Sequence, residues 1–85
     1  MSRAFRTEPP IPHDDLLAAL PAMGLKTSIE AEDGRPIQYV YRGEESLVVR
    51  PSPSGHAELA EVEGYPAPGL LETIAGHFGV EMVEV

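Results

Sequence analysis

The side chains that could perform chemistry are few, and they lie apart in the sequence. His13 stands beside Asp14 and Asp15, and a histidine next to carboxylates can bind a metal or transfer protons. We expect the two aspartates to cap a helix instead, because their oxygens can accept the free backbone N–H groups of a first turn. Three adjacent residues also point in different directions from a helix. The triplet therefore predicts neither a catalytic nor a metal site.

The other histidines do not complete a catalytic or metal-binding set. His13, His56 and His77 are expected on three separate elements, and no two of them have the spacing of a metal-binding pair on one helix. Ser54 lies two residues before His56, but residues 51–55 have the Pro, Ser and Gly content of a hairpin loop. A small enzyme that uses His56 or His13 stays open as an alternative, because active sites can be assembled from scattered residues. The sequence indicates a protein without catalytic residues, cofactor or metal.

Two tyrosines and two arginines could bind a small molecule. Tyr39 and Tyr41 lie two apart on a predicted strand and so share a face, where paired aromatic side chains stack on bases or pack together. Because only 6 basic side chains stand against 14 acidic ones, nucleic acid is not expected as a direct partner. A regulatory domain that binds a metabolite between sheet and helices, or in a dimer cleft, is the alternative, with Tyr39, Tyr41, Arg42 and Arg50 as candidate ligand-binding residues.

Acidic residues are concentrated in the second half of the chain. Residues 1–43 contain six acidic and five basic side chains, a net charge of −1, whereas residues 44–85 contain eight acidic and one basic, a net charge of −7. Such charge can serve solubility alone, but an acidic surface also speeds the docking of a basic partner. We therefore predict a non-catalytic protein-interaction module, an accessory subunit or inhibitor. It would bind a basic protein surface through seven glutamates: Glu44, Glu45, Glu58, Glu61, Glu63, Glu81 and Glu84.

A variant of this hypothesis is that the acidic face imitates a nucleic acid and blocks an enzyme that binds one. Competition with DNA or RNA for the same enzyme would then be expected.

Two amphipathic helices are predicted to position these residues. Residues 12–20 and residues 66–79 each carry a Leu-Leu-x-x-(Leu/Ile) spacing, which places the apolar side chains on one helix face. Gly24 and Gly79 are expected as left-handed stops, each followed by an apolar residue that begins a strand. The shared pattern suggests that both helices lie on the same face of one sheet.

Most of the remaining chain is predicted as strands. The five predicted segments are residues 25–32, 37–42, 46–50, 56–63 and 80–85, and residues 4–7 are an optional first strand. Asp33-Gly34 predicts a tight turn, and the apolar run 46–50 predicts a strand covered on both faces. Residues 56–63 fit no clean period and are predicted as a strand with a bulge near Ala60. Residues 1–12 are otherwise expected to form an extended or partly ordered arm.

Length and composition limit the chain to one small domain over residues 1–85. With 42% apolar residues it can fold, but a chain of this size buries only about 60–65% of its unfolded surface, which favours an oligomeric or partner interface such as a homodimer. The predicted class is α+β, a small antiparallel sheet of four to six strands with two helices packed on one face.

The compartment is inferred from absent features. Cysteine is absent, which excludes disulfides and thiolate ligands and favours a reducing compartment. Residues 1–12 lack the apolar stretch of a signal peptide, and no window resembles a membrane span. We therefore expect a cytoplasmic protein with no membrane partner.

Overall fold

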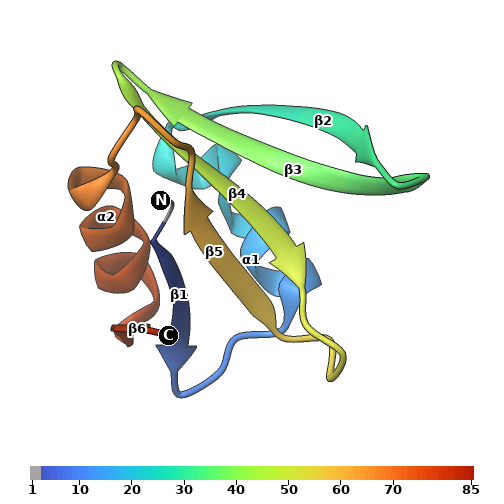
Figure 1. The fold of residues 1–85 in the computed structure, drawn as a ribbon. Coiled ribbons are helices and arrows are strands. Elements are labelled where there is room, and N and C mark those ends of the chain that lie inside the picture. The colour runs from blue at the N-terminus through green and yellow to red at the C-terminus, as the bar shows by residue number, and fades with distance from the viewer. Residues whose placement is uncertain (1–2) are drawn as a thin grey trace.

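The computed structural model describes residues 3–85, and in it two helices cover one face of an antiparallel sheet (Figure 1). The predicted α+β class is confirmed. The elements are β1 (Ala4–Glu8), α1 (His13–Ala19), the 3-10 helix η1 (Pro21–Met23), β2 (Lys26–Glu32), β3 (Arg35–Arg42), β4 (Glu45–Pro51), β5 (Ala57–Glu61), α2 (Pro68–Phe78) and β6 (Glu81–Glu84).

The six strands lie in the order β2-β3-β4-β5-β1-β6. Strands β2 to β5 form a meander, as their short connections predict. Strand β1 then enters between β5 and β6, and each neighbouring pair is antiparallel. Most of the segment expected as an arm therefore lies inside the sheet or close to it, and residues 1–2 fall outside the described residues. The two edges of the sheet are β2 and β6.

The helix ends follow the sequence in part. Gly24 and Gly79 have φ of 71° and 66°, which confirms the predicted left-handed stops. The predicted capping by Asp14 and Asp15 is wrong, because the N-cap position of α1 is Pro12 and no side chain caps it. The two aspartates lie in the first turn, where the helix dipole favours negative charge without a capping hydrogen bond.

Strand β5 is regular. It pairs residue by residue with β4 from Ala57 to Glu61 and with β1 from Glu58 to Ala60, so the predicted bulge near Ala60 is wrong. The apolar alternation is interrupted because the third inward-facing position of this strand, after Ala57 and Leu59, holds Glu61. In the sequence alone, a glutamate at a buried position interrupts the apolar alternation in the same way as an extra residue in the strand would.

The core lies between the sheet and the helices. Its largest fully buried side chains come from both helices and the central strands: Leu16, Leu20, Val40, Leu47, Val49, Leu59, Leu70 and Ile74. On β4 the intervening Val48 is also buried, although it faces away from the helices, whereas Ser46 and Arg50 on the same face are half-buried. The predicted cover on both faces therefore holds at Val48 and not along the whole strand. Val48 pairs with Tyr39 of β3 and with Ala60 of β5 on that outer face.

The β2–β3 hairpin extends beyond the end of its pairing with β4. The β3–β4 pairing ends at Gln38 and Val49, and the hairpin then projects away from the helices (Figure 1). Its turn is the predicted one, since Asp33 and Gly34 both have positive φ, 51° and 76°. These values are typical of the two-residue type I′ turn.

Candidate protein-binding surface

The structure does not gather the seven predicted glutamates on one face. Strand pairing places two on the outer face of the sheet and three on the face that carries the helices: Glu58 and Glu81, then Glu45, Glu61 and Glu84. The remaining two, Glu44 and Glu63, lie in the turns that follow β3 and β5. A single acidic face made of all seven is therefore absent from the part of the chain that the structure describes.

Glu45 acts inside the molecule as a cap for α2. This helix has Ala67 at its N-cap position and receives no cap from it. The carboxylate of Glu45, on β4, accepts hydrogen bonds from the backbone N–H groups of Gly69 at 3.2 Å and Leu70 at 2.7 Å. Because free N–H groups at a helix start attract negative charge, the carboxylate stabilises the helix and joins it to the sheet.

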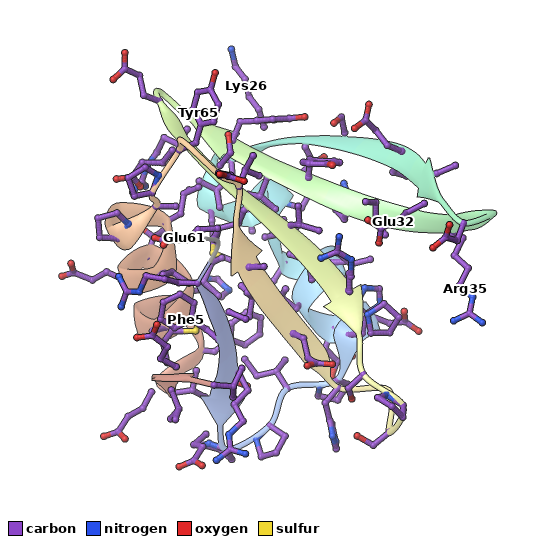
Figure 2. The ribbon with its side chains drawn as sticks, in the orientation of Figure 1. Phe5, Lys26, Glu32, Arg35, Glu61 and Tyr65 are labelled. Atoms are coloured by element: carbon purple, nitrogen blue, oxygen red, sulfur yellow. The ribbon has the colours of Figure 1, made fainter. Side chains whose placement is uncertain are left out.

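Glu61 is the second glutamate with an internal role. Its side chain points toward the start of α2 and is only 6% exposed (Figure 2). Its Oε2 accepts a 2.7 Å hydrogen bond from the backbone N–H of Ala67. A buried carboxylate without such a donor would be costly, so this bond explains how the residue is tolerated in the core. Glu61 is therefore not part of the outer surface.

Glu84 and Glu58 lie beside arginines. Both carboxylate oxygens of Glu84 accept hydrogen bonds from the guanidinium of Arg3 at 3.0 Å, and this bonding holds the pKa of Glu84 below its ordinary value. Glu58 is exposed on β5, directly between Arg50 of β4 and Arg6 of β1 in the strand register. Neither glutamate contributes an isolated negative charge.

Of the three remaining glutamates, Glu81 is exposed on the edge strand β6, and the other two lie near an exposed aromatic residue. A hollow of about 560 Å³ is lined by Arg42, Gly43, Glu44, Glu45, Gly64, Pro66 and Pro68. Glu63 lies in the adjoining turn, which a 2.9 Å hydrogen bond from the N–H of Tyr65 to the carbonyl of Val62 closes. Tyr65 itself is 50% exposed and lies at this end of the molecule (Figure 2). We call Glu44, Glu63, Tyr65, Pro66 and Pro68 the Tyr65 surface.

Sequence reasoning missed Tyr65. The signal available was a tyrosine between Gly64 and Pro66, in a segment too rich in turn residues to bury it. Exposed tyrosines on turns are frequent in protein interfaces, because they add contact area at a low cost in conformational entropy.

The four residues of the small-molecule alternative do not converge. Tyr39 and Tyr41 stack with their ring centroids 6.2 Å apart, and the Tyr41 hydroxyl lies 2.8 Å from Ser28 Oγ. They share the outer face with Arg50, whereas strand register places Arg42 on the opposite face. Arg50 binds the carboxylate of Glu32 through two hydrogen bonds of 2.8 Å. The polar atoms of Tyr41 and Arg50 are therefore engaged within the protein.

Arg50 also borders a hollow of about 650 Å³ beside the projecting hairpin. Its lining consists of His13, Glu32, Asp33, Arg35, Pro36, Ile37, Arg50 and Pro51. The two tyrosines are not part of this lining, so the hollow does not join the four candidate residues into one site.

The histidines remain on three separate elements. Nδ1 of His56 lies 3.0 Å from Ser54 Oγ, and its backbone N–H donates to Ser52 Oγ at 3.2 Å. These bonds close the β4–β5 loop. His77 packs edge-to-face on Phe78, and His13 Nδ1 lies 3.5 Å from an Asp14 oxygen. Within residues 3–85, no group of three or more His, Cys, Asp or Glu side chains is placed to hold a metal ion.

Comparison with known proteins assigns no function to these surfaces. No protein-family model, curated protein or solved structure matches the chain. Neither helix among the described residues has the length and apolar character needed to cross a membrane.

Proposed function

We propose that the protein is a non-catalytic interaction module, an accessory subunit or inhibitor, that binds a basic protein segment on the Tyr65 surface. The observation that carries this proposal is the half-exposed Tyr65, which lies between Gly64 and Pro66, two residues that line a hollow together with Glu44. An aromatic anchor with polar neighbours is the usual composition of a binding hot spot.

Hydrogen bonds to Glu61 and Glu45 fix the backbone next to the Tyr65 surface. Glu61 binds the N–H of Ala67, and Glu45 binds the next two N–H groups available in the chain, those of Gly69 and Leu70. The connection that presents Tyr65 is therefore anchored to β4 and β5 just beyond its C-terminal end. A preorganised surface loses less conformational entropy on binding, which favours affinity.

The exposed charges fit a basic partner. Among residues 3–85, neither Glu44 nor Glu63 forms an ion pair, and both are exposed. Arg42 offsets part of this charge, because it lines the same hollow. The net negative charge at the Tyr65 surface would speed association with the Lys and Arg side chains of a partner. It would also make the association rate sensitive to salt.

The test begins with a photo-cross-linking residue at position 65, and at position 81 on β6 as the comparison. A partner captured only from position 65 is then purified and titrated by calorimetry over a salt series. We expect Tyr65→Ala to weaken its binding by about tenfold or more, and the double variant Glu44→Lys, Glu63→Lys to slow association and reduce the salt dependence.

Glu81→Lys is the matched control, because it makes the same change of charge on an exposed residue at the far edge of the sheet. It should leave affinity close to that of the wild type. A captured partner whose binding is indifferent to Tyr65→Ala and to both charge reversals would contradict the proposal.

A further inference from the structure

Strand β2 is the longer of the two open edges of the sheet. It has seven residues, pairs only with β3 in the sheet order, and contains no proline. At its centre Ile29 is 70% exposed. Natural edge strands are usually protected by shortness, charge, proline or a bulge, because a free edge can pair with another strand. Strand β2 carries charges at Lys26, Glu30 and Glu32, but it is longer than the opposite edge, β6, which has four residues, two of them glutamates.

We propose that a second copy of this chain pairs with β2, antiparallel, about a twofold axis at Ile29. In this register Ile29 meets its own copy, and Thr27 lies opposite Ala31. Lys26 lies opposite Glu32 at both ends of the paired segment. Opposite charges directly across an antiparallel pair are stabilising. Figure 2 shows Lys26 and Glu32 at the two ends of the strand.

The backbone of the hairpin supports the same axis. In a two-residue type I′ hairpin, the residues that flank the turn, here Glu32 and Arg35, form a hydrogen-bonded pair. Hydrogen-bonded and non-hydrogen-bonded pairs alternate along the two strands from the Glu32–Arg35 pair. The even-numbered residues of β2 therefore direct their N–H and C=O groups toward β3. Thr27, Ile29 and Ala31 direct theirs outward. An axis at Ile29 joins these outward groups in about six hydrogen bonds.

A twofold axis at either of the other two residues with outward backbone groups, Ala31 or Thr27, gives a less favourable strand pairing. An axis at Ala31 places Glu30 opposite Glu32 of the second copy, and like charges directly opposite are destabilising. An axis at Thr27 shortens the overlap within β2 and places Lys26 opposite Ser28. Only the axis at Ile29 pairs the whole strand and matches its charges.

The pairing also covers exposed apolar surface. Strand register places Thr27, Ile29 and Ala31 on the helix side of the sheet, but the helices do not cover this part of the hairpin. Two copies would bring both Ile29 side chains together beside Thr27 and Ala31. The projecting hairpin in Figure 1 leaves the edge accessible. Removal of this apolar surface from water favours association.

A charge exchange between two variants tests the register. Lys26→Glu creates two Glu–Glu contacts across the axis. Glu32→Lys creates two Lys–Lys contacts and also removes the Arg50–Glu32 ion pair within each chain. Each variant alone should dimerise at least about tenfold more weakly than the wild type in sedimentation velocity. An equimolar mixture should recover dimer, because both contacts become Glu–Lys in the mixed pair. Arg6→Glu is the control, since it makes the same change of charge as Lys26→Glu at an exposed residue of β1, which three strands separate from the β2 edge.

A cysteine placed on the axis gives an independent readout. The chain has no cysteine, and paired residues on a twofold axis have a Cα separation suited to a disulfide. Ile29→Cys should form a disulfide-linked dimer on mild oxidation. Thr27→Cys should not, because it lies opposite Ala31.

Three results would overturn the proposal. They are a wild-type chain that stays monomeric at all concentrations, a mixture of charge variants no more dimeric than its components, and equal cross-linking at positions 27 and 29. Tyr65→Ala should leave the dimer intact, so this inference and the proposed function fail separately.

Discussion

The carboxylate of Glu45, on β4, accepts a 2.7 Å hydrogen bond from the backbone N–H of Leu70, 25 residues further along the chain. The strand thus supplies the cap that α2 does not obtain from Ala67. Gly69 is suited to this contact, because a Cβ atom there would come within 2.9 Å of a Glu45 oxygen. The relationship joins the first turn of the helix to the central strands.

Removal of this cap should destabilise the fold. We expect Glu45→Ala to lower the free energy of unfolding by about 1–2 kcal/mol, because two N–H groups of the first turn lose their acceptor. Chemical denaturation measures the change. Its neighbour Glu44 is exposed in the turn, so Glu44→Ala should change stability by no more than about 0.5 kcal/mol. Equal effects of the two substitutions would show that Glu45 does not cap α2.

The buried carboxylate of Glu61 should be more sensitive to truncation than to neutralisation. We expect Glu61→Ala to cost about 1–3 kcal/mol, because the N–H of Ala67 would be left buried without an acceptor. Glu61→Gln keeps a carbonyl oxygen at the same reach and should retain part of that stability. A Glu61→Gln variant as unstable as Glu61→Ala in the same denaturation experiment would argue against the hydrogen bond as the cause.

Stability should fall in acid through the two glutamate–arginine pairs. Hydrogen bonding from Arg50 lowers the pKa of Glu32, and hydrogen bonding from Arg3 lowers the pKa of Glu84, both from an ordinary value of 4.5. A lowered folded-state pKa means that the stabilisation is present above the unfolded-state value and is lost as pH falls through the folded-state value. Thermal unfolding should therefore show declining stability below about pH 4.5.

Arg50→Ala removes one of these pairs and should flatten that decline. Since the Glu32 and Arg50 side chains are each partly exposed to solvent, added salt should also reduce the contribution of the pair. Arg35→Ala, in the same hairpin, is the comparison, because Arg35 forms none of the ion pairs seen among residues 3–85. An unchanged pH profile in Arg50→Ala would contradict the assignment.

Two glycines of one helix should respond in opposite directions to the same change. Gly76 lies inside α2 with open space where a methyl group would be added, so Gly76→Ala should stabilise the protein by about 0.5–1 kcal/mol. Gly79 ends the helix with φ of 66°, where a Cβ atom is strained, and Gly79→Ala should destabilise it by about 1 kcal/mol. Thermal unfolding of both variants checks the prediction, and a shift of the same sign in both would refute it.

The sequence by itself determined the local structure. Leucine spacing marks both helices, Gly24 and Gly79 mark where helical segments stop, and Asp33-Gly34 marks the hairpin turn. These features depend on residues within one or two turns of each other, so their physical causes are visible in short windows. The α+β class follows from the order of such elements.

Only the tertiary structure decided the roles of the glutamates and the position of β1. Charge counting placed Glu45 and Glu61 with the outer acidic residues, whereas the fold directs both toward backbone N–H groups at the start of α2. Two further glutamates, Glu44 and Glu63, remain beside Tyr65 at the surface. The physical reason is that a hydrogen-bond partner for a carboxylate is a matter of position in space, and long-range strand pairing sets that position.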